Sequence, residues 1–496
     1  MKIFIANTGK FLQKIPKWLW LVLGVTAVLR LPSLFEPHRY ADEDIYFTLG
    51  MAMRRGLNFY KDIHDNKPPL IYFLAGLAGS IFWLRLILLL WHAVNIFFVY
   101  LLAKEILGKK NQNLIIFATA LFSFLTTIPA FEGNIANGEI FMIMPATIGA
   151  YLLWKNCRKT RRLVFFWTGA LFAIAFLFKV PIIFDLVGIM LFVWIFNNDS
   201  WKKRLKFLTQ PAFWLTLAGF LLPIALTTFY YWTIGAFKPF FYSALFQNIG
   251  YLSSWEGAGQ PLWQGGLFQR GVILSAIIAF LFIVKKHLRK ETLFIALWFA
   301  FSLFGALLSG RPYAHYLIEA SVPFALLVSL IFSSKKALEK VILAVVGCLA
   351  FISFFYYRFW SYKNLPYYQN FVSFVLGRKS QQEYFDFFGS VTRNYQVAYF
   401  IKERTVKNDK IFVWGTQPAI YVVSKRLPVG RYTVSYHVAD FNAWDETING
   451  LIQKKPEFIV KMLDEEKDFG RLDSLLASDY ISVKTIEEAE IWKRIK

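Results

Sequence analysis

The sequence predicts an α-helical, polytopic membrane protein with about 11 transmembrane helices and a small extracytoplasmic α/β domain at its C-terminus. Of its 496 residues, 56% are hydrophobic and 19% are aromatic. Several apolar runs reach about 18 residues, the length that crosses a ~30 Å hydrocarbon core. After residue 358 the apolar runs shorten to strand length and alternate with polar, helix-like stretches. We therefore expect a membrane domain over 1–358 and an α/β domain over 359–496.

The basic residues indicate the topology. The formal net charge of +23 would suggest a nucleic-acid partner in a soluble protein. Here the positive charges lie in short loops between apolar runs, at 104–110, 155–162, 201–206, 285–290 and 333–340. Such clusters mark the cytoplasmic face of a membrane protein. They account for the charge without nucleic acid.

The apolar runs give the expected helices in order. The first run follows positive charge but lacks a small-residue cleavage site, so we expect it to stay as a helix, with the N-terminus in the cytoplasm. The expected crossings are 17–35, 85–104, 113–129, 138–154, 164–180, 182–197, 210–232, 270–285, 292–309, 315–333 and 340–358. The C-terminal domain then lies on the extracytoplasmic side, and we expect the protein in the plasma or inner membrane of the cell.

Residues 68–84 form an apolar run of uncertain role. If this run crossed the membrane, the basic loop 155–162 would lie outside, against the charge rule. We therefore expect an interfacial or partly embedded helix. Cys157 and Cys348 are the only cysteines, so no disulfide framework is predicted.

The expected outer face collects the unusual chemistry. It comprises the first outer loop 36–69, the loop 130–139, the loop 233–269, residues 309–316 and everything after 358. The expected strands of the outer domain include 410–415 and 457–461. We find no internal repeat, which disfavours the architecture of many secondary transporters.

The first outer loop places several acids directly after the first helix. Asp42, Glu43 and Asp44 precede Lys67 and the rigid pair Pro68 and Pro69. Each acid alone could be a solvated surface group. The combination of charge, aromatic residues and a fixed turn predicts a site in which a carboxylate acts as a general base.

Other charged residues lie in or beside the later outer loops. Glu132 and Glu139 form a second acidic loop. This loop is either an ordinary turn, or its carboxylates act as a general base and as a ligand of a metal or a hydroxyl group. Lys179 stands alone between two apolar runs. It either extends to the membrane surface or meets a lipid phosphate.

Residues 309–316 combine a guanidinium with aromatic and imidazole groups. Arg311 can donate two hydrogen bonds to a phosphate through its guanidinium fork. Tyr313 and His315 can donate to the remaining phosphate oxygens. The alternative is an interfacial aromatic belt with one paired arginine. We predict that Lys67, Lys179 and Arg311 meet at one lipid phosphate. No nucleotide-binding or metalloprotease motif occurs, and a divalent metal stays possible.

The first outer loop resembles that of the GT-C membrane glycosyltransferases, specifically the protein O-mannosyltransferase and aminoarabinose-transferase-like group. The matching residues are Asp42-Glu43, Tyr46, Gly56, Tyr60 and Lys67-Pro68-Pro69. The segments 137–141, 311–324 and 409–432 are similar to later parts of bacterial members. In aminoarabinose members a basic residue stands where this chain has Ile45. The resemblance assigns no role to Asp44, Asp62 and Asp65.

The resemblance implies a GT-C-like fold and transfer of one sugar from a polyprenyl-phosphate carrier, with inversion, on the extracytoplasmic side. The acceptor would be a protein, a lipid or a glycan. Asp42, with Glu43 beside it, matches the family's acidic base, and Lys67 matches the lysine that contacts the leaving phosphate. The sugar and the acceptor are not fixed by any motif.

Two other functions compete with a transferase. A transporter or flippase of lipid-linked sugars would place ionisable residues within its helices and repeat its halves. A membrane anchor for the C-terminal domain would leave the acidic first loop without a purpose, because one helix would suffice. The sequence favours the transferase.

Overall fold

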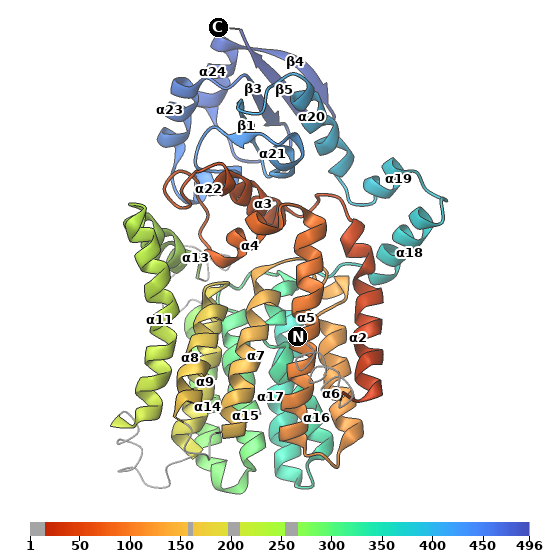
Figure 1. The fold of residues 1–496 in the computed structure, drawn as a ribbon, viewed down its shortest axis with the longest axis vertical. Coiled ribbons are helices and arrows are strands. Elements are labelled where there is room, and N and C mark those ends of the chain that lie inside the picture. The colour runs from red at the N-terminus through yellow and green to blue at the C-terminus, as the bar shows by residue number, and fades with distance from the viewer. Residues whose placement is uncertain (1–14, 157–161, 197–208, 253–265, 496) are drawn as a thin grey trace, which may run out of the picture. The chain divides into compact units, whose positions relative to one another are not determined.

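The computed structural model describes residues 15–156, 162–196, 209–252 and 266–495 (Figure 1). The chain divides into two compact units. Unit 1 comprises Met1–Leu31, Ile87–Thr227 and Ile249–Asn364, and unit 2 comprises Pro32–Leu86, Thr228–Asn248 and Leu365–Lys496. The first outer loop therefore belongs to the same compact unit as the C-terminal domain.

Most long helices lie wholly or mainly in unit 1, and each expected crossing coincides with one of them. They are α2 (Lys17–Arg30), α5 (Ile81–Leu107), α6 (Gln112–Leu125), α7 (Gly138–Asn156), α8 (Leu163–Phe176), α9 (Ile183–Phe196), α11 (Pro211–Thr233), α14 (Gly266–Val284), α15 (Lys290–Ala306), α16 (Ser321–Ser333) and α17 (Ala337–Tyr356). Short 3-10 turns also occur at η1 (Leu31–Phe35), η2 (Pro129–Phe131), η3 (Val180–Ile182), η6 (Lys285–His287) and η7 (Ala314–Ile318).

Five helical segments among the described residues are long and apolar enough to span a membrane by length and composition. They are Lys17–Phe35, Ile81–Leu107, Pro211–Thr233, Gly266–His287 and Ala337–Tyr356. Shorter apolar helices lie at Gln112–Leu125, Leu163–Phe176, Val180–Phe196 and Ser321–Ser333. The prediction of a helical, multi-pass membrane protein is confirmed.

The uncertain run 68–84 contains a short helix, α4 (Leu70–Ala78). Its nine residues rise by about 14 Å, less than half of a hydrocarbon core. It ends at Gly79, whose φ of 70° is left-handed, and α5 begins at Ile81. The helix is therefore too short to cross, in agreement with the expected interfacial role.

Unit 2 contains the α/β domain. Its strands are β1 (Lys410–Trp414), β2 (Leu427–Pro428), β3 (Phe458–Met462), β4 (Tyr480–Ile486) and β5 (Ala489–Arg494), in the order β2-β1-β3-β5-β4. Strand β1 is parallel to β2 and β3, whereas β5 is antiparallel to β3 and β4. The two strands named from the sequence are confirmed.

Helices cover both faces of this sheet (Figure 1). Residues of α20 (Val391–Glu403) and α21 (Ala419–Ser424) pack on one face around Ile411, Val413 and Val460. Residues of α23 (Trp444–Lys454) and α24 (Gly470–Asp479) pack on the other face around Phe412 and Ile459. Alternate residues of β1 and β3 point to opposite cores, as the pleat requires.

The remaining helices of unit 2 lie in the first outer loop, in residues 228–248 and before or within the α/β domain. They are α3 (Ala41–Arg54), α12 (Phe237–Phe241), the π-helical turn η5 (Tyr242–Phe246), α13 (Gln247–Tyr251, which continues into unit 1), α18 (Asn364–Val375), α19 (Gln381–Asp386) and α22 (Ser435–Asp440). A Cβ at Gly50 of α3 would lie 2.6 Å from the backbone N of Gly76 in α4. Glycine therefore lets α3 and α4 approach closely. This contact fixes the helices on either side of residues 55–69, which include Lys67.

Candidate active site

Asp42 and Lys67 form an ion pair in unit 2. Asp42 lies in the first turn of α3, where the positive end of the helix dipole stabilises a carboxylate. Its Oδ2 is 3.1 Å from Lys67 Nζ, and the two side chains are 25% and 21% exposed. The Tyr46 hydroxyl lies 3.5 Å from the same oxygen. A carboxylate and an ammonium are thus held together within reach of a ligand.

The surroundings keep Lys67 charged. Burial lowers the pKa of Lys67, but the negative charges of Asp42 and Asp65 and the phenol groups nearby outweigh it and raise the pKa well above the ordinary lysine value. The ammonium also lies 5.2 Å from the centroid of the Tyr46 ring. Lys67 is therefore a permanent cation at neutral pH.

The backbone around Lys67 is held by aromatic packing. The Tyr60 hydroxyl donates to the carbonyl of Lys67 at 2.7 Å, and Tyr60 itself has a left-handed φ of 71°. Its ring stacks on Phe59 with centroids 3.8 Å apart. Asn248 donates to the carbonyl of Asn66 at 2.7 Å. These contacts fix the Lys67 backbone before any substrate arrives.

Glu43 has a different environment from its neighbour Asp42. Glu43 is fully buried, and Arg85 donates to both of its oxygens, including a bond of 3.0 Å from Nε to Oε1. Arg85 also lies 3.1 Å from Glu36, and the side chains of all three are 0% exposed. Both oxygens of Glu43 are thus used within a buried ion-pair network.

The buried network should be a major source of stability in unit 2. Arg85→Met leaves the carboxylate of Glu43 buried without its cation, so we expect the free energy of unfolding to fall by about 3–5 kcal/mol. The exposed pair of Arg404 and Glu403 offers a control, and Arg404→Met should cost less than about 1 kcal/mol. Chemical denaturation of the purified protein in detergent micelles measures both values. Equal small losses would contradict the assignment of Glu43 to a structural pair.

The structure also places the acids to which the resemblance gave no role. Asp44 is buried and pairs with His38 Nδ1 at 2.5 Å, and burial raises its pKa despite that histidine. Asp62 accepts from the backbone N–H of Asn58 at 2.8 Å and so closes a turn. Asp65 is fully buried, and its Oδ1 lies 3.6 Å from His437 Nε2.

A second cluster of predicted residues lies in unit 1. The carboxylates of Glu132 and Glu139 flank His315, whose Nδ1 bonds Glu132 and whose Nε2 lies 3.5 Å from Glu139. Lys179 Nζ bonds Glu139 as well. Side-chain exposure is 16% for Lys179 and 5% or less for the other three. The structure therefore joins the second acidic loop to Lys179 and His315, which the sequence offered separately.

Aromatic rings enclose this second cluster. Lys179 Nζ lies 4.2 Å from the Tyr316 ring centroid, and the Tyr313 ring stacks on His315 with centroids 5.7 Å apart. Lys179 pairs with a buried acid rather than extending to the surface.

Arg311 lies between α15 and η7, where its backbone N–H donates to Ser309 Oγ at 3.3 Å. Because Lys67 belongs to unit 2, the meeting of Lys67, Lys179 and Arg311 at one phosphate stays a prediction.

Two comparisons with known proteins bear on this chain. The family model of dolichyl-phosphate-mannose-protein mannosyltransferases matches residues 66–232. The crystal structure of ArnT from Cupriavidus metallidurans bound to undecaprenyl phosphate is similar with a TM-score of 0.57 and 12% sequence identity, over 96% of this chain and 97% of that chain. The chain has the fold of ArnT.

The ArnT fold extends over nearly the whole chain, so the GT-C-like fold expected from the first outer loop is confirmed. The apo structure of the same ArnT gives a TM-score of 0.44, with 12% identity over 98% of each chain. No curated protein sequence matches this chain.

Several buried ionisable residues in this ArnT fold were not singled out from the sequence. Asp185 of α9 accepts from Trp298 Nε1 and Ser302 Oγ, both at 2.5 Å. An acid within an apolar run is itself a signal of a functional group, and Asp185 lies in such a run. Arg85 similarly stands within an apolar run. His437 has no comparable signal, because nothing in its neighbourhood distinguishes it from an ordinary domain residue.

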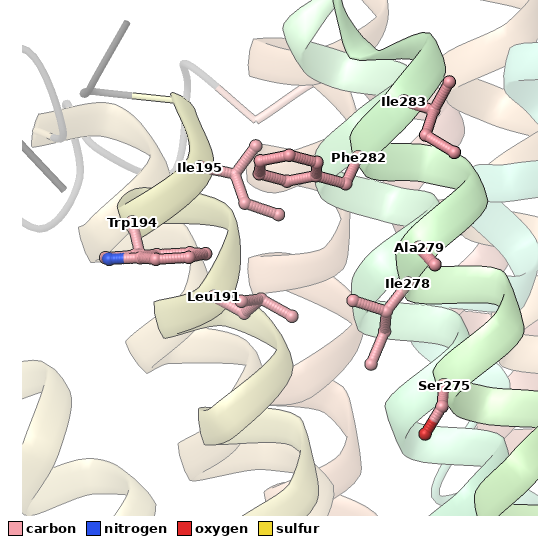
Figure 2. A pocket seen from close by; sticks show the side chains of 8 residues that line it. All are labelled: Leu191, Trp194, Ile195, Ser275, Ile278, Ala279, Phe282 and Ile283. Atoms are coloured by element: carbon pink, nitrogen blue, oxygen red, sulfur yellow. The ribbon is translucent and has the colours of Figure 1, made fainter. Parts of the chain in front are cut away.

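An apolar groove of about 400 Å³ lies between α9 and α14 (Figure 2). Leu191, Trp194, Ile195, Ser275, Ile278, Ala279, Phe282 and Ile283 line it, and Ser275 contributes the only hydroxyl among these described residues. None of the charged candidates borders this groove.

Within the described parts of the chain, no group of three metal-ligating side chains has a geometry suited to a metal ion.

Two buried histidines should make unit 2 sensitive to acid. His64 is fully buried, and burial together with His437 and Arg431 lowers its pKa to about 3. Burial also lowers the pKa of His437. Each histidine is neutral in the fold but takes up a proton near pH 6.5 once unfolded, so its stabilising effect is complete above about pH 6.5 and declines as the pH falls toward 3.

We expect the thermal unfolding midpoint of the purified protein to fall between pH 7 and pH 5. The His64→Gln variant should show a smaller fall, because one such histidine contributes up to about 1.4 kcal/mol per pH unit. His287 is exposed, so His287→Gln should keep the full fall. Identical pH dependence in the two variants would contradict a buried, neutral His64.

Proposed function

We propose that the protein is an integral-membrane glycosyltransferase that moves a hexosyl or pentosyl group from a polyprenyl-phosphate carrier to an acceptor on the extracytoplasmic face, with inversion. The Asp42–Lys67 pair carries this proposal, because it combines an accessible carboxylate and a fixed cation 3.1 Å apart. The crystal structure that shares the fold holds undecaprenyl phosphate, and the matching family model describes enzymes that use a dolichyl-phosphate sugar. Both support a lipid-phosphate donor.

The reaction follows from the chemistry of this pair. An acceptor hydroxyl oxygen attacks the anomeric carbon while the carboxylate of Asp42 takes the hydroxyl proton. The bond from the anomeric carbon to the phosphate oxygen breaks, and its electrons leave with the phosphate. Lys67 stabilises the charge that develops there. Attack from the side opposite the phosphate inverts the configuration, so the 3.1 Å ion pair of Asp42 and Lys67 must open when the donor and the acceptor bind.

The geometry favours Asp42 over Glu43 as the base. Arg85 donates to both oxygens of Glu43, so proton uptake by that carboxylate would break a buried ion pair. Asp42 retains solvent exposure and pairs with Lys67. We accordingly assign the base to Asp42 and a structural role to Glu43.

The cluster in unit 1 remains a candidate for further phosphate contacts. Lys179 and His315 now bond Glu139 and Glu132, so a phosphate that binds there must share or displace these carboxylates. Arg311 and Tyr313 complete the proposed set. We also propose a cytoplasmic N-terminus and an extracytoplasmic unit 2, from the basic loops; the loop 201–206 and most of the loop 155–162 lie outside the described residues.

One observation favours the competing flippase. That function predicts ionisable residues within membrane helices, and Asp185 in α9 is buried among apolar residues. Reconstitution distinguishes the two functions. In liposomes that contain the purified protein, a polyprenyl-phosphate sugar and membrane extract as acceptor, a transferase should convert the loaded carrier to bare polyprenyl phosphate. A flippase would move the loaded lipid between leaflets and leave its sugar attached.

A further inference from the structure

Three neighbouring side chains are among those in unit 2 that carry a buried polar atom without a well-aligned hydrogen-bond partner. They are His64, Asp65 and His437, which are 0%, 0% and 4% exposed. The atoms are His64 Nε2, Asp65 Oδ2 and His437 Nδ1. The side chain of Gln247, whose Oε1 is also buried without a well-aligned partner, interacts with His64 as well. A buried polar group without a partner is costly, so three of them in one place point to a bound group that pairs with them.

The three residues come together from distant parts of the sequence. His64 and Asp65 belong to the first outer loop, whereas His437 lies on α22 of the C-terminal domain. His437 Nε2 lies 3.6 Å from Asp65 Oδ1, and the rings of His64 and His437 have centroids 6.5 Å apart. Phe441 packs against both rings. We refer to His64, Asp65 and His437 as the His-Asp-His cluster.

The cluster adjoins the proposed reacting pair. Asp65 is two residues before Lys67, and its charge contributes to the raised pKa of that lysine. Both Lys67 and Asp42 in turn affect the pKa of His437, as charges do over short distances. A group that pairs with the cluster would therefore lie near Lys67, which follows Asp65 by two residues in the chain.

The available atoms define the chemistry of that group. Asp65 Oδ2 is an acceptor, and His437 Nδ1 is a second acceptor when Nε2–H points to Asp65. His64 Nδ1 lies 3.2 Å from Ser243 Oγ, so Nε2–H is a donor when the serine donates to Nδ1. The carboxylate of Asp65 repels a phosphate. A hydroxyl group, which donates and accepts, matches this set.

We propose that the His-Asp-His cluster binds a sugar hydroxyl beside the reacting pair, so that the C-terminal domain takes part in sugar recognition through His437. The hydroxyl donates to Asp65 or His437 and accepts from His64. It belongs either to the sugar being transferred or to a glycan acceptor. This inference rests on the proposed glycosyltransferase function.

Lipid retention by the immobilised full-length protein tests whether the bound hydroxyl belongs to the donor sugar. The probe is the total polyprenyl-phosphate lipid extracted from bacterial membranes, and mass spectrometry gives the ratio of sugar-loaded to bare carrier that each variant retains. If the hydroxyl belongs to the donor, this ratio falls about tenfold in Asp65→Asn and in His437→Gln, as expected for one lost hydrogen bond. Thr447→Ala removes a buried hydroxyl of the same domain that bonds only backbone, and it should keep the ratio.

Transfer kinetics at varied acceptor concentration test whether the bound hydroxyl belongs to the acceptor. If the hydroxyl belongs to the acceptor, the lipid ratio stays constant and KM for the acceptor rises about tenfold in both variants, with KM for the donor unchanged. Folded variants that keep the lipid ratio and both KM values would overturn the cluster as a sugar site. A wild-type protein that retains neither loaded nor bare carrier would instead overturn the proposed function, and the inference with it.

Discussion

The Asp42→Asn variant should transfer sugar at least about 10²-fold more slowly than the wild-type protein. The amide has nearly the same shape as the carboxylate but does not take up a proton from the acceptor hydroxyl. Rates of sugar transfer in reconstituted liposomes measure this effect. The thermal unfolding midpoint of the variant should stay near that of the wild type, because Asp42 is partly exposed and its ion pair with Lys67 is accessible to solvent.

Asp62→Asn is the matched control for that variant. Asp62 lies in the same loop, and its carboxylate accepts a backbone hydrogen bond that an amide oxygen can also accept. Its transfer rate should stay within about twofold of the wild-type rate, since it takes no part in proton transfer. A normal rate in Asp42→Asn would remove Asp42 from the role of base.

Lys67→Met should lower the transfer rate by about 10²–10³-fold, because the leaving phosphate loses the cation that stabilises it. Methionine keeps a similar apolar stem while it removes the charge, which lies 5.2 Å from the Tyr46 ring centroid. Lys61→Met is the control, since Lys61 is exposed in the same loop and should have little effect. Transfer rates measured over a range of donor concentrations separate weaker carrier binding from a slower chemical step.

The double variant Asp42→Asn/Lys67→Met adds a test of the pairing itself. Groups that act on one transition state give losses that do not add, so the double variant should be little slower than the slower single variant. Losses that multiply fully would indicate that Asp42 and Lys67 act on separate steps. That outcome would contradict a shared reacting centre.

Much of the fold could be predicted from the sequence because long apolar runs and short strand-like runs obey simple length rules. Helices cover every expected crossing, and 410–415 and 457–461 contain β1 and β3. The extent of unit 2 was harder to predict. Residues 228–248 lie far from the first outer loop in sequence, yet they belong to the same compact unit.

The candidate site was predictable in its residues but not in their roles. Asp42 and Glu43 are neighbours in sequence, but successive helix residues point about 100° apart, so one reaches Lys67 and the other reaches Arg85. Glu132 and His315 bond across 183 residues, which no local pattern reveals. His437 enters only because the C-terminal domain folds onto the acidic loop within unit 2.

The lipid that accumulates in cells tests the central claim most directly. Cells in which Asp42→Asn replaces the wild-type protein should accumulate one polyprenyl-phosphate-linked sugar, because its transfer is blocked while its synthesis continues. Mass spectrometry of extracted lipids identifies that sugar, and cells with Asp62→Asn should show the wild-type lipid pool. An unchanged pool of sugar-loaded carrier in the Asp42→Asn cells, with the variant protein folded and present in the membrane, would contradict a glycosyltransferase centred on Asp42 and Lys67.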